Sequence, residues 1–233
     1  LVQLEELAIG NYGTPADAQL LKIDVQGFAG DDSIQFGGSF VSSTLKAGAG
    51  NDTLDIAATT GTSASSATEF YAGAGSDSVN VSSGQNLTIY ADSSASDTAG
   101  GADSLEIAGL TSSTVYGAAG GDTLNLSDAT ASTKNRIELG EGTNYATGAQ
   151  VYTSSTLIGG SGVDKLILAG VTGGGYVAGE AGADSLVFNV AVGGVNTTTM
   201  ATILGGTGAD TLDFNAAILN ASVLGGSDSL GLI

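Results

Sequence analysis

The stretch GGTGADTLDF (residues 205–214) decides the fold of this chain. Its glycines permit backbone angles with φ > 0 and therefore a sharp turn. The alternation that follows, with Leu212 and Phe214 on one side and Asp213 on the other, is typical of a short strand. The stretch thus predicts a tight polar turn that presents Asp210 and leads into a strand.

The same pattern recurs along the chain at intervals of 18 to 26 residues. A period near 22 residues with variable insertions suits one turn of a solenoid. Each repeat carries one polar anchor residue at the position of Asp210, which is aspartate in all repeats but one. The anchors are Asp32, Asp52, Asp77, Asp103, Asp122, Asn144, Asp164, Asp184, Asp210 and Asp228.

Apolar residues lie at fixed distances from the anchors. Two and four residues after most anchors the chain is apolar, as at Leu54 and Ile56, and the residue between them is mostly polar. A further apolar column lies seven residues before most anchors, and Ile89 fills it in the repeat that carries a polar insertion at 92–99. Each repeat therefore predicts a strand, a Gly-Asp corner, a second strand and a variable return.

We predict an all-β chain that folds as a right-handed parallel β-solenoid of about ten turns, with one Gly-Asp corner per turn. At about 4.8 Å per turn, the rod would be roughly 45–50 Å long. The solenoid is expected over residues 25–233, and residues 1–24 are expected to form an N-terminal segment or a preceding coil. Neither end shows a capping pattern, so we expect the ends to self-associate or to pair with neighbouring domains.

The composition restricts the function. The chain has 24 acidic and 5 basic residues, a formal net charge of −19, and no Cys or His. Nucleic acid and anionic membranes are poor partners, because both require a basic surface, and no apolar run is long enough for membrane insertion as a helix. Disulfides, thiolate nucleophiles, imidazole-ligated zinc and Ser-His catalysis are absent. We expect no enzymatic activity, because the carboxylates follow the repeat and no local exception marks a catalytic pair.

Stacked turns would place the anchors in one column, about one inter-strand distance apart, where ionised carboxylates repel one another. Because the chain supplies so few basic residues, external cations are the simplest source of neutralisation. Carboxylate oxygens and the carbonyl oxygens of glycine loops are ligands that Ca²⁺ prefers. The alternative is that Gly-Asp turns are simply favourable corners with exposed, solvated aspartates. The predicted metal-binding residues are the ten anchors together with Gly30, Gly48, Gly50, Gly73, Gly75, Gly160, Gly162, Gly206 and Gly208.

Several of these stretches resemble a known calcium-binding repeat. GGSGVDKLI (159–167) and GGTGADTLD (205–213) match the repeat-in-toxin (RTX) consensus G-G-x-G-x-D-x-U-x, and AGAGNDTLD (47–55) and AGAGSDSVN (72–80) match it with alanine first. The resemblance implies a parallel β-helix that binds Ca²⁺. RTX rolls repeat the motif about every nine residues and so bind calcium on both edges. Here the motif occurs once per turn, which implies one calcium-binding edge and an opposite edge that is free to vary.

The resemblance also implies type I secretion and folding outside the cell. The composition, rich in Ala, Gly, Ser and Thr and poor in Lys, is most similar to surface-layer and adhesin members of the family. We therefore expect a calcium-binding structural segment of a secreted, extracellular bacterial cell-surface protein, such as a surface layer (S-layer) or another extracellular assembly. The alternative is the RTX repeat region of a secreted enzyme, toxin or adhesin whose active part lies outside this fragment.

Four tyrosines raise a separate question. Tyr71, Tyr90, Tyr116 and Tyr176 each lie next to the apolar column that precedes the corner. A ladder of aromatic rings could serve as a platform for a ligand such as a carbohydrate. Plain packing, or a solvated outward face, is the simpler interpretation and the one we favour.

Overall fold

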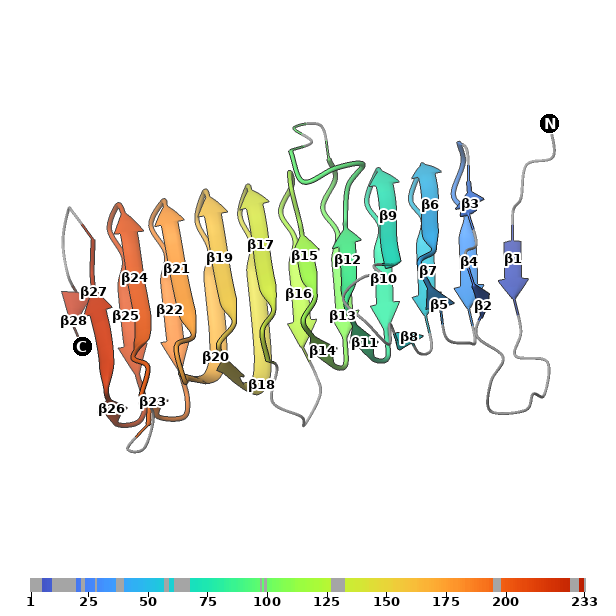
Figure 1. The fold of residues 1–233 in the computed structure, drawn as a ribbon. Coiled ribbons are helices and arrows are strands. Elements are labelled where there is room, and N and C mark those ends of the chain that lie inside the picture. The colour runs from blue at the N-terminus through green and yellow to red at the C-terminus, as the bar shows by residue number, and fades with distance from the viewer. Residues whose placement is uncertain are drawn as a thin grey trace.

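The computed structural model describes residues 6–9, 20–21, 24–27, 29–36, 40–56, 59–60, 68–96, 98, 100–126, 133–194, 198–226 and 231–232. Over these ranges the chain is all-β and winds as a parallel solenoid, with the strands perpendicular to the long axis (Figure 1). The predicted fold class is confirmed.

Two long sheets form the two broad faces of the rod. Within the described ranges, each strand of a sheet comes from a different turn, and every pairing is parallel. The 11-stranded sheet consists of β1 (Glu6–Ile9), β4 (Ser33–Phe36), β7 (Thr53–Ile56), β10 (Ser78–Val81), β13 (Ser104–Ile107), β16 (Thr123–Leu126), β18 (Tyr145–Thr153), β20 (Lys165–Thr172), β22 (Ser185–Phe188), β25 (Thr211–Phe214) and β28 (Gly231–Leu232). The 10-stranded sheet consists of β3 (Asp24–Gln26), β6 (Thr44–Ala49), β9 (Thr68–Ala74), β12 (Leu87–Tyr90), β15 (Thr114–Tyr116), β17 (Arg136–Glu141), β19 (Thr156–Ser161), β21 (Tyr176–Ala181), β24 (Ala201–Thr207) and β27 (Ala221–Leu224).

The core lies between the two sheets and is built from the predicted apolar columns. Leu54 pairs in register with Val79, which pairs with Leu105, and all three are at most 2% exposed. On the facing sheet, Ile89 stands between Phe70 and Val115, as predicted for the repeat with the insertion. Such in-register stacking buries a continuous core that no single turn could bury alone.

The returns carry short strands that the sequence did not predict. They form a three-stranded sheet of β8 (Thr59–Thr60), β11 (Gly84–Gln85) and β14 (Leu110–Thr111), and two pairs, β2 (Leu20–Leu21) with β5 (Phe40–Val41) and β23 (Val192–Gly193) with β26 (Ile218–Leu219). Each of these strands is only two residues long, too short to show the alternation on which strand prediction depends. Most of the predicted N-terminal segment lies outside the described residues, although β1 within it pairs with β4.

Close approach of successive corners explains their glycines. Gly160 and Gly162 have φ angles of 117° and 127°, which favour glycine. A Cβ atom at Gly162 would also lie under 3.0 Å from the carbonyl oxygen of Gly142 in the preceding turn. The corners therefore stack main chain upon main chain, and this fixes the position of the anchor that follows each glycine.

Candidate functional site

The anchors stand at the corner where the 10-stranded sheet passes to the 11-stranded sheet, at the top of Figure 1. Each anchor comes directly before a strand of the 11-stranded sheet, as Asp52 precedes β7 and Asp184 precedes β22. Because these strands pair in register, the anchors from Asp32 to Asp210 form the predicted column. Asp228 lies outside the described residues.

Hydrogen bonds connect each anchor to the next. The main-chain N–H of Asp52 donates to Oδ1 of Asp77 at 2.7 Å, and the same bond recurs at every step from Asp32 to Asp210 at 2.7–3.1 Å. The main-chain carbonyl of Asp52 accepts from the N–H of Ser78 at 2.8 Å. The anchor side chains thus continue the main-chain ladder through a corner where two main chains alone could not form it.

The anchors are buried. The nine from Asp32 to Asp210 are between 0% and 9% exposed, so the alternative of solvated aspartates is wrong for them. The reason is geometric, because a carboxylate that reaches the N–H of the previous turn must lie beneath the corner. Only one oxygen of each carboxylate serves the ladder. The Oδ2 atoms of seven anchors are buried and have no hydrogen-bond partner, namely those of Asp52, Asp77, Asp103, Asp122, Asp164, Asp184 and Asp210.

Glycine or alanine lies beside the Oδ2 atom at several of these anchors. A Cβ atom at Gly159 would lie under 3.0 Å from both Oδ2 of Asp164 and the carbonyl oxygen of Gly179 in the next turn. The same pair of a carboxylate oxygen and a next-turn carbonyl oxygen surrounds Gly117, Gly179 and Gly205. At these steps two hard oxygen atoms converge on the position that a side chain would take, and we call this position a cradle. At Ala47 and Ala72, which take the same place beside Asp52 and Asp77, a buried methyl group stands there instead.

Burial and the neighbouring carboxylates oppose ionisation of the anchor aspartates. Burial raises the pKa of Asp77 and of Asp184 to about 6, that of Asp122 to about 7 and that of Asp103 to about 8. Neighbouring carboxylates raise these pKa values further, whereas the main-chain N–H donors lower them. The Lys and Arg residues within the described ranges are all exposed, so none of them neutralises the column.

Asp92 is a buried acid that the sequence did not single out. It opens the insertion and takes the place that Gly73 and Ala118 occupy in neighbouring turns, as the pairing of Tyr90 with Tyr71 and Tyr116 shows. Its side chain is fully buried, and Oδ2 accepts the main-chain N–H of Ala119 at 3.0 Å. Its charge raises the pKa of Asp77, Asp103 and Asp122. This is the local exception to the repeat that the sequence did not reveal, because an aspartate within a polar insertion resembles any loop residue.

The opposite corner, at the bottom of Figure 1, carries a second ladder over part of its length. The N–H of Leu87 donates to Oγ of Ser113 at 3.1 Å, that of Ser113 to Oδ1 of Asn135 at 2.9 Å, and that of Asn135 to Oγ of Ser155 at 3.1 Å. Ser113, Asn135 and Ser155 are 2–3% exposed. The opposite edge is therefore not free to vary in these turns, and its side-chain acceptors are neutral.

Replacing Asn135 by alanine tests this second ladder. The N–H of Ser113 and the carbonyl of Leu110, which accepts from Nδ2 of Asn135 at 2.9 Å, would both lose their partner. We expect the free energy of unfolding to fall by about 1–3 kcal/mol, measured by urea unfolding. Asn125→Ala on the outer face is the control and should change it by less than about 0.5 kcal/mol. Equal effects of the two variants would contradict a ladder at Asn135.

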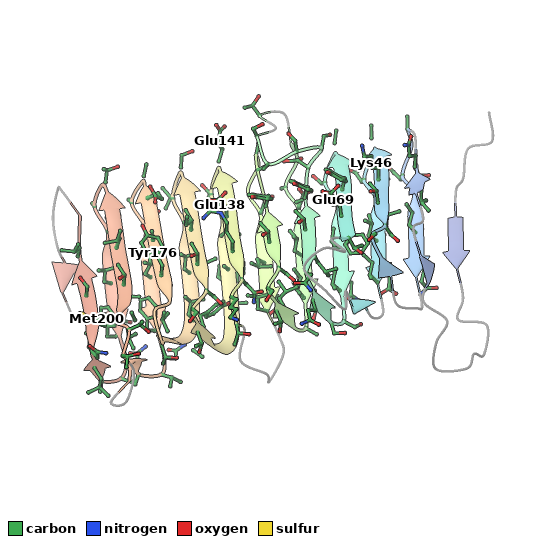
Figure 2. The ribbon with its side chains drawn as sticks, in the orientation of Figure 1. Lys46, Glu69, Glu138, Glu141, Tyr176 and Met200 are labelled. Atoms are coloured by element: carbon green, nitrogen blue, oxygen red, sulfur yellow. The ribbon has the colours of Figure 1, made fainter. Side chains whose placement is uncertain are left out.

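Three of the four tyrosines form a stack on the outer face of the 10-stranded sheet, whereas Tyr176 stands between Thr156 and Thr202 of the neighbouring strands. The ring centroids of Tyr71 and Tyr90 are 4.5 Å apart, those of Tyr90 and Tyr116 are 5.2 Å apart, and both pairs are nearly parallel. The Nζ atom of Lys46 lies 5.1 Å from the Tyr71 centroid, and the Tyr71 hydroxyl donates to Glu69 at 3.1 Å; Lys46 and Glu69 are labelled in Figure 2. Ring faces that contact one another are not available to a sugar, so the packing interpretation is favoured for this stack.

Other types of site find no support in the described part of the chain. No group of three or more acidic side chains there gathers into a metal site, so any cation on the column must also use main-chain oxygens. None of the described residues forms a helix able to span a membrane. Comparison with protein-family models, curated proteins and solved structures found no match.

Proposed function

We propose that this chain is a calcium-binding structural segment of a secreted bacterial cell-surface protein, in which Ca²⁺ ions along the anchor column hold the turns of the rod together. The rod would serve as part of an S-layer or a related extracellular assembly. The proposal rests on the column, and in particular on the buried Oδ2 atoms that have no partner.

The two ladders of the molecule supply the main support. A ladder needs one acceptor per turn, and Ser and Asn provide it at the opposite corner. Asn144 provides it within the anchor column itself, where it accepts from Asp122 at 2.9 Å. Hydrogen bonding alone therefore does not require carboxylates. Eight of the nine described anchors are nevertheless aspartate, and in seven of these turns the second carboxylate oxygen is buried without a partner.

The oxygens around the cradles fit a hard cation at some steps better than at others. Asp122, Asp164, Asp184 and Asp210 each offer Oδ2 beside a glycine and a next-turn carbonyl oxygen, a donor set that calcium prefers. Bound there, Ca²⁺ would supply the positive charge that the exposed Lys and Arg residues do not supply. The methyl groups of Ala47 and Ala72 make Asp52 and Asp77 weaker candidates.

Surface features support the assembly part of the proposal. The net charge of −19 keeps rods apart unless cations screen it. In the last described turns, the apolar side chains of Ile218, Leu219 and Leu224 are 38–58% exposed. Exposed apolar residues of this kind are suited to contacts with another copy of the chain.

Calcium binding and its effect on folding test the proposal directly. The purified chain is depleted of metal, titrated with CaCl₂ in a calorimeter, and followed by far-UV circular dichroism and light scattering. We expect several bound ions per chain, a gain in β-structure or in thermal stability, and larger particles at saturating calcium. Mg²⁺ at the same ionic strength is the control, because it demands a more regular octahedron of ligands.

Two results would count against the proposal. A β-signal and melting temperature that do not change with calcium, with no metal retained on mass spectrometry, would remove the cation-binding part. A stable monomer at saturating calcium would remove the assembly part and favour the alternative role, the repeat region of a secreted enzyme, toxin or adhesin.

A further inference from the structure

We propose that the anchor column comprises two independent cation-binding segments, Asp32 to Asp122 and Asp164 to Asp210, separated by a neutral step at Asn144 and Leu139. This inference rests on the proposed function, since it concerns the ions expected on the same column. We expect two classes of calcium site that differ in affinity, with the tighter sites in the segment from Asp164 to Asp210.

Asn144 continues the hydrogen-bond ladder but interrupts the row of carboxylates. Its Oδ1 accepts the N–H of Asp122 at 2.9 Å, and its own N–H donates to Oδ1 of Asp164 at 2.9 Å. It is 1% exposed, like the aspartates on either side. The main-chain structure of the rod is therefore the same at this step, whereas the second carboxylate oxygen is replaced by an amide nitrogen.

Leu139 fills the cradle at the same turn. The pairing of Glu138 with Tyr116 and with Ile158 places Leu139 level with Gly117 in the turn before and with Gly159 in the turn after. Both glycines leave a cradle beside an Oδ2 atom, but Leu139 is 1% exposed and belongs to the apolar core. The turn of Asn144 thus lacks both the second carboxylate oxygen and the oxygen-lined cradle.

Asn144 is also neutral where the anchors on either side are acidic. Its Nδ2 atom is buried and has no hydrogen-bond partner, and the same holds for Oδ2 of Asp164 in the next turn. The step at Asn144 therefore carries no carboxylate for a cation to neutralise. Compared with its neighbours, this turn has Asn in place of Asp and Leu in place of Gly. Both differences make the step at Asn144 neutral and apolar.

The two segments differ in their cradles. All three described anchors from Asp164 onward have glycine beside Oδ2, at Gly159, Gly179 and Gly205. In the other segment, Asp32 and Asp122 also have glycine in this place, at Gly27 and Gly117. Asp52 and Asp77 have Ala47 and Ala72 there instead, and Asp92 adds a further buried carboxylate near Asp103. Tighter binding is therefore expected where every step has an oxygen-lined cradle.

The test uses isosteric variants, because asparagine keeps the Oδ1 acceptor and the ladder. Calorimetric titration of the wild-type chain with CaCl₂ should show a tight phase and a weaker phase. Asp184→Asn should reduce the stoichiometry of the tight phase only, and Asp77→Asn should alter the weak phase only. If either variant changes both phases equally, the two segments are not independent and the inference is wrong.

A second variant restores the consensus at the neutral step. Asn144→Asp combined with Leu139→Gly should add bound calcium and merge the two phases into one. Asn125→Asp adds the same charge on the outer face of the adjacent strand and should do neither. A folded double variant that binds no more calcium than the wild type overturns the inference, while a wild type that binds no calcium overturns the proposed function itself.

Discussion

In metal-depleted protein, the free energy of unfolding is expected to fall as the pH rises from about 5 to about 8, and calcium is expected to restore it at the higher pH. The folded-state pKa values of Asp77 and Asp184 are about 6, that of Asp122 is about 7 and that of Asp103 is about 8, all raised from 3.8. Between 3.8 and these values the folded chain binds more protons than the unfolded chain. Stability is therefore lost as the pH increases through this window, by several kcal/mol in total.

Urea unfolding of the depleted protein at about pH 5, 6.5 and 8, each with and without CaCl₂, measures this effect. Calcium should have little effect at the acidic end, where protons occupy the carboxylates, and a large stabilising effect at the alkaline end. The double variant Asp103→Asn with Asp122→Asn is the matched control, because it keeps both Oδ1 acceptors and removes two titrating groups. Its stability without calcium should depend less on pH. Depleted wild-type protein that is as stable at the alkaline end as at the acidic end would contradict a column of carboxylates held neutral by burial.

Gly120→Ala is expected to destabilise the rod by about 2–6 kcal/mol, a large share of the stability of an ordinary domain. Gly120 has a φ angle of 128°, which side-chain-bearing residues rarely adopt. A Cβ atom there would lie under 3.0 Å from the carbonyl oxygen of Gly101 in the preceding turn. Relief would require the corners of Asp103 and Asp122 to move apart, which would lengthen the hydrogen bond of 2.9 Å between them.

The adjacent glycine provides the control for this variant. Gly121 has no positive φ angle, and a Cβ atom there would have its nearest neighbour, the carbonyl oxygen of Thr143, at 3.1 Å. Gly121→Ala should therefore stay within about 1 kcal/mol of the wild type. Urea unfolding gives both values, and hydrogen exchange should show the loss of protection of Gly120→Ala concentrated in the turns on either side of residue 120. Similar losses in the two variants would mean that stacking of the corners is not the cause.

The fold could be predicted from the sequence because every repeat contains the same pattern of strand and corner residues. Alternation around Leu54 and Ile56, and glycines at fixed offsets before Asp52, define the strands and the corner with information local to one turn. Register between turns then follows, since a shift by one residue would expose every apolar column. The short strands of the returns were missed because their pairing depends on neighbouring turns rather than on their own composition.

The candidate site was predicted only in outline. The column of anchors follows from the period, but the burial of Asp103 and the direction of its carboxylate depend on the exact height of the next corner. Ser113 and Asn135 were missed because serine and asparagine are common in the returns and become a ladder only when turns are stacked. Asp92 was missed for a similar reason, since its partner Ala119 is in the next turn.

The hydrogen bonds of both long sheets lie along the axis of the rod, because each strand pairs with a strand of the next turn (Figure 1). A pull on the two ends would thus load the interfaces between turns in series. The rod would yield at its weakest interface, and each rupture would release the covalent length of one turn. Extension would then proceed in discrete steps, and the molecule would absorb mechanical work turn by turn while the remaining turns keep their structure.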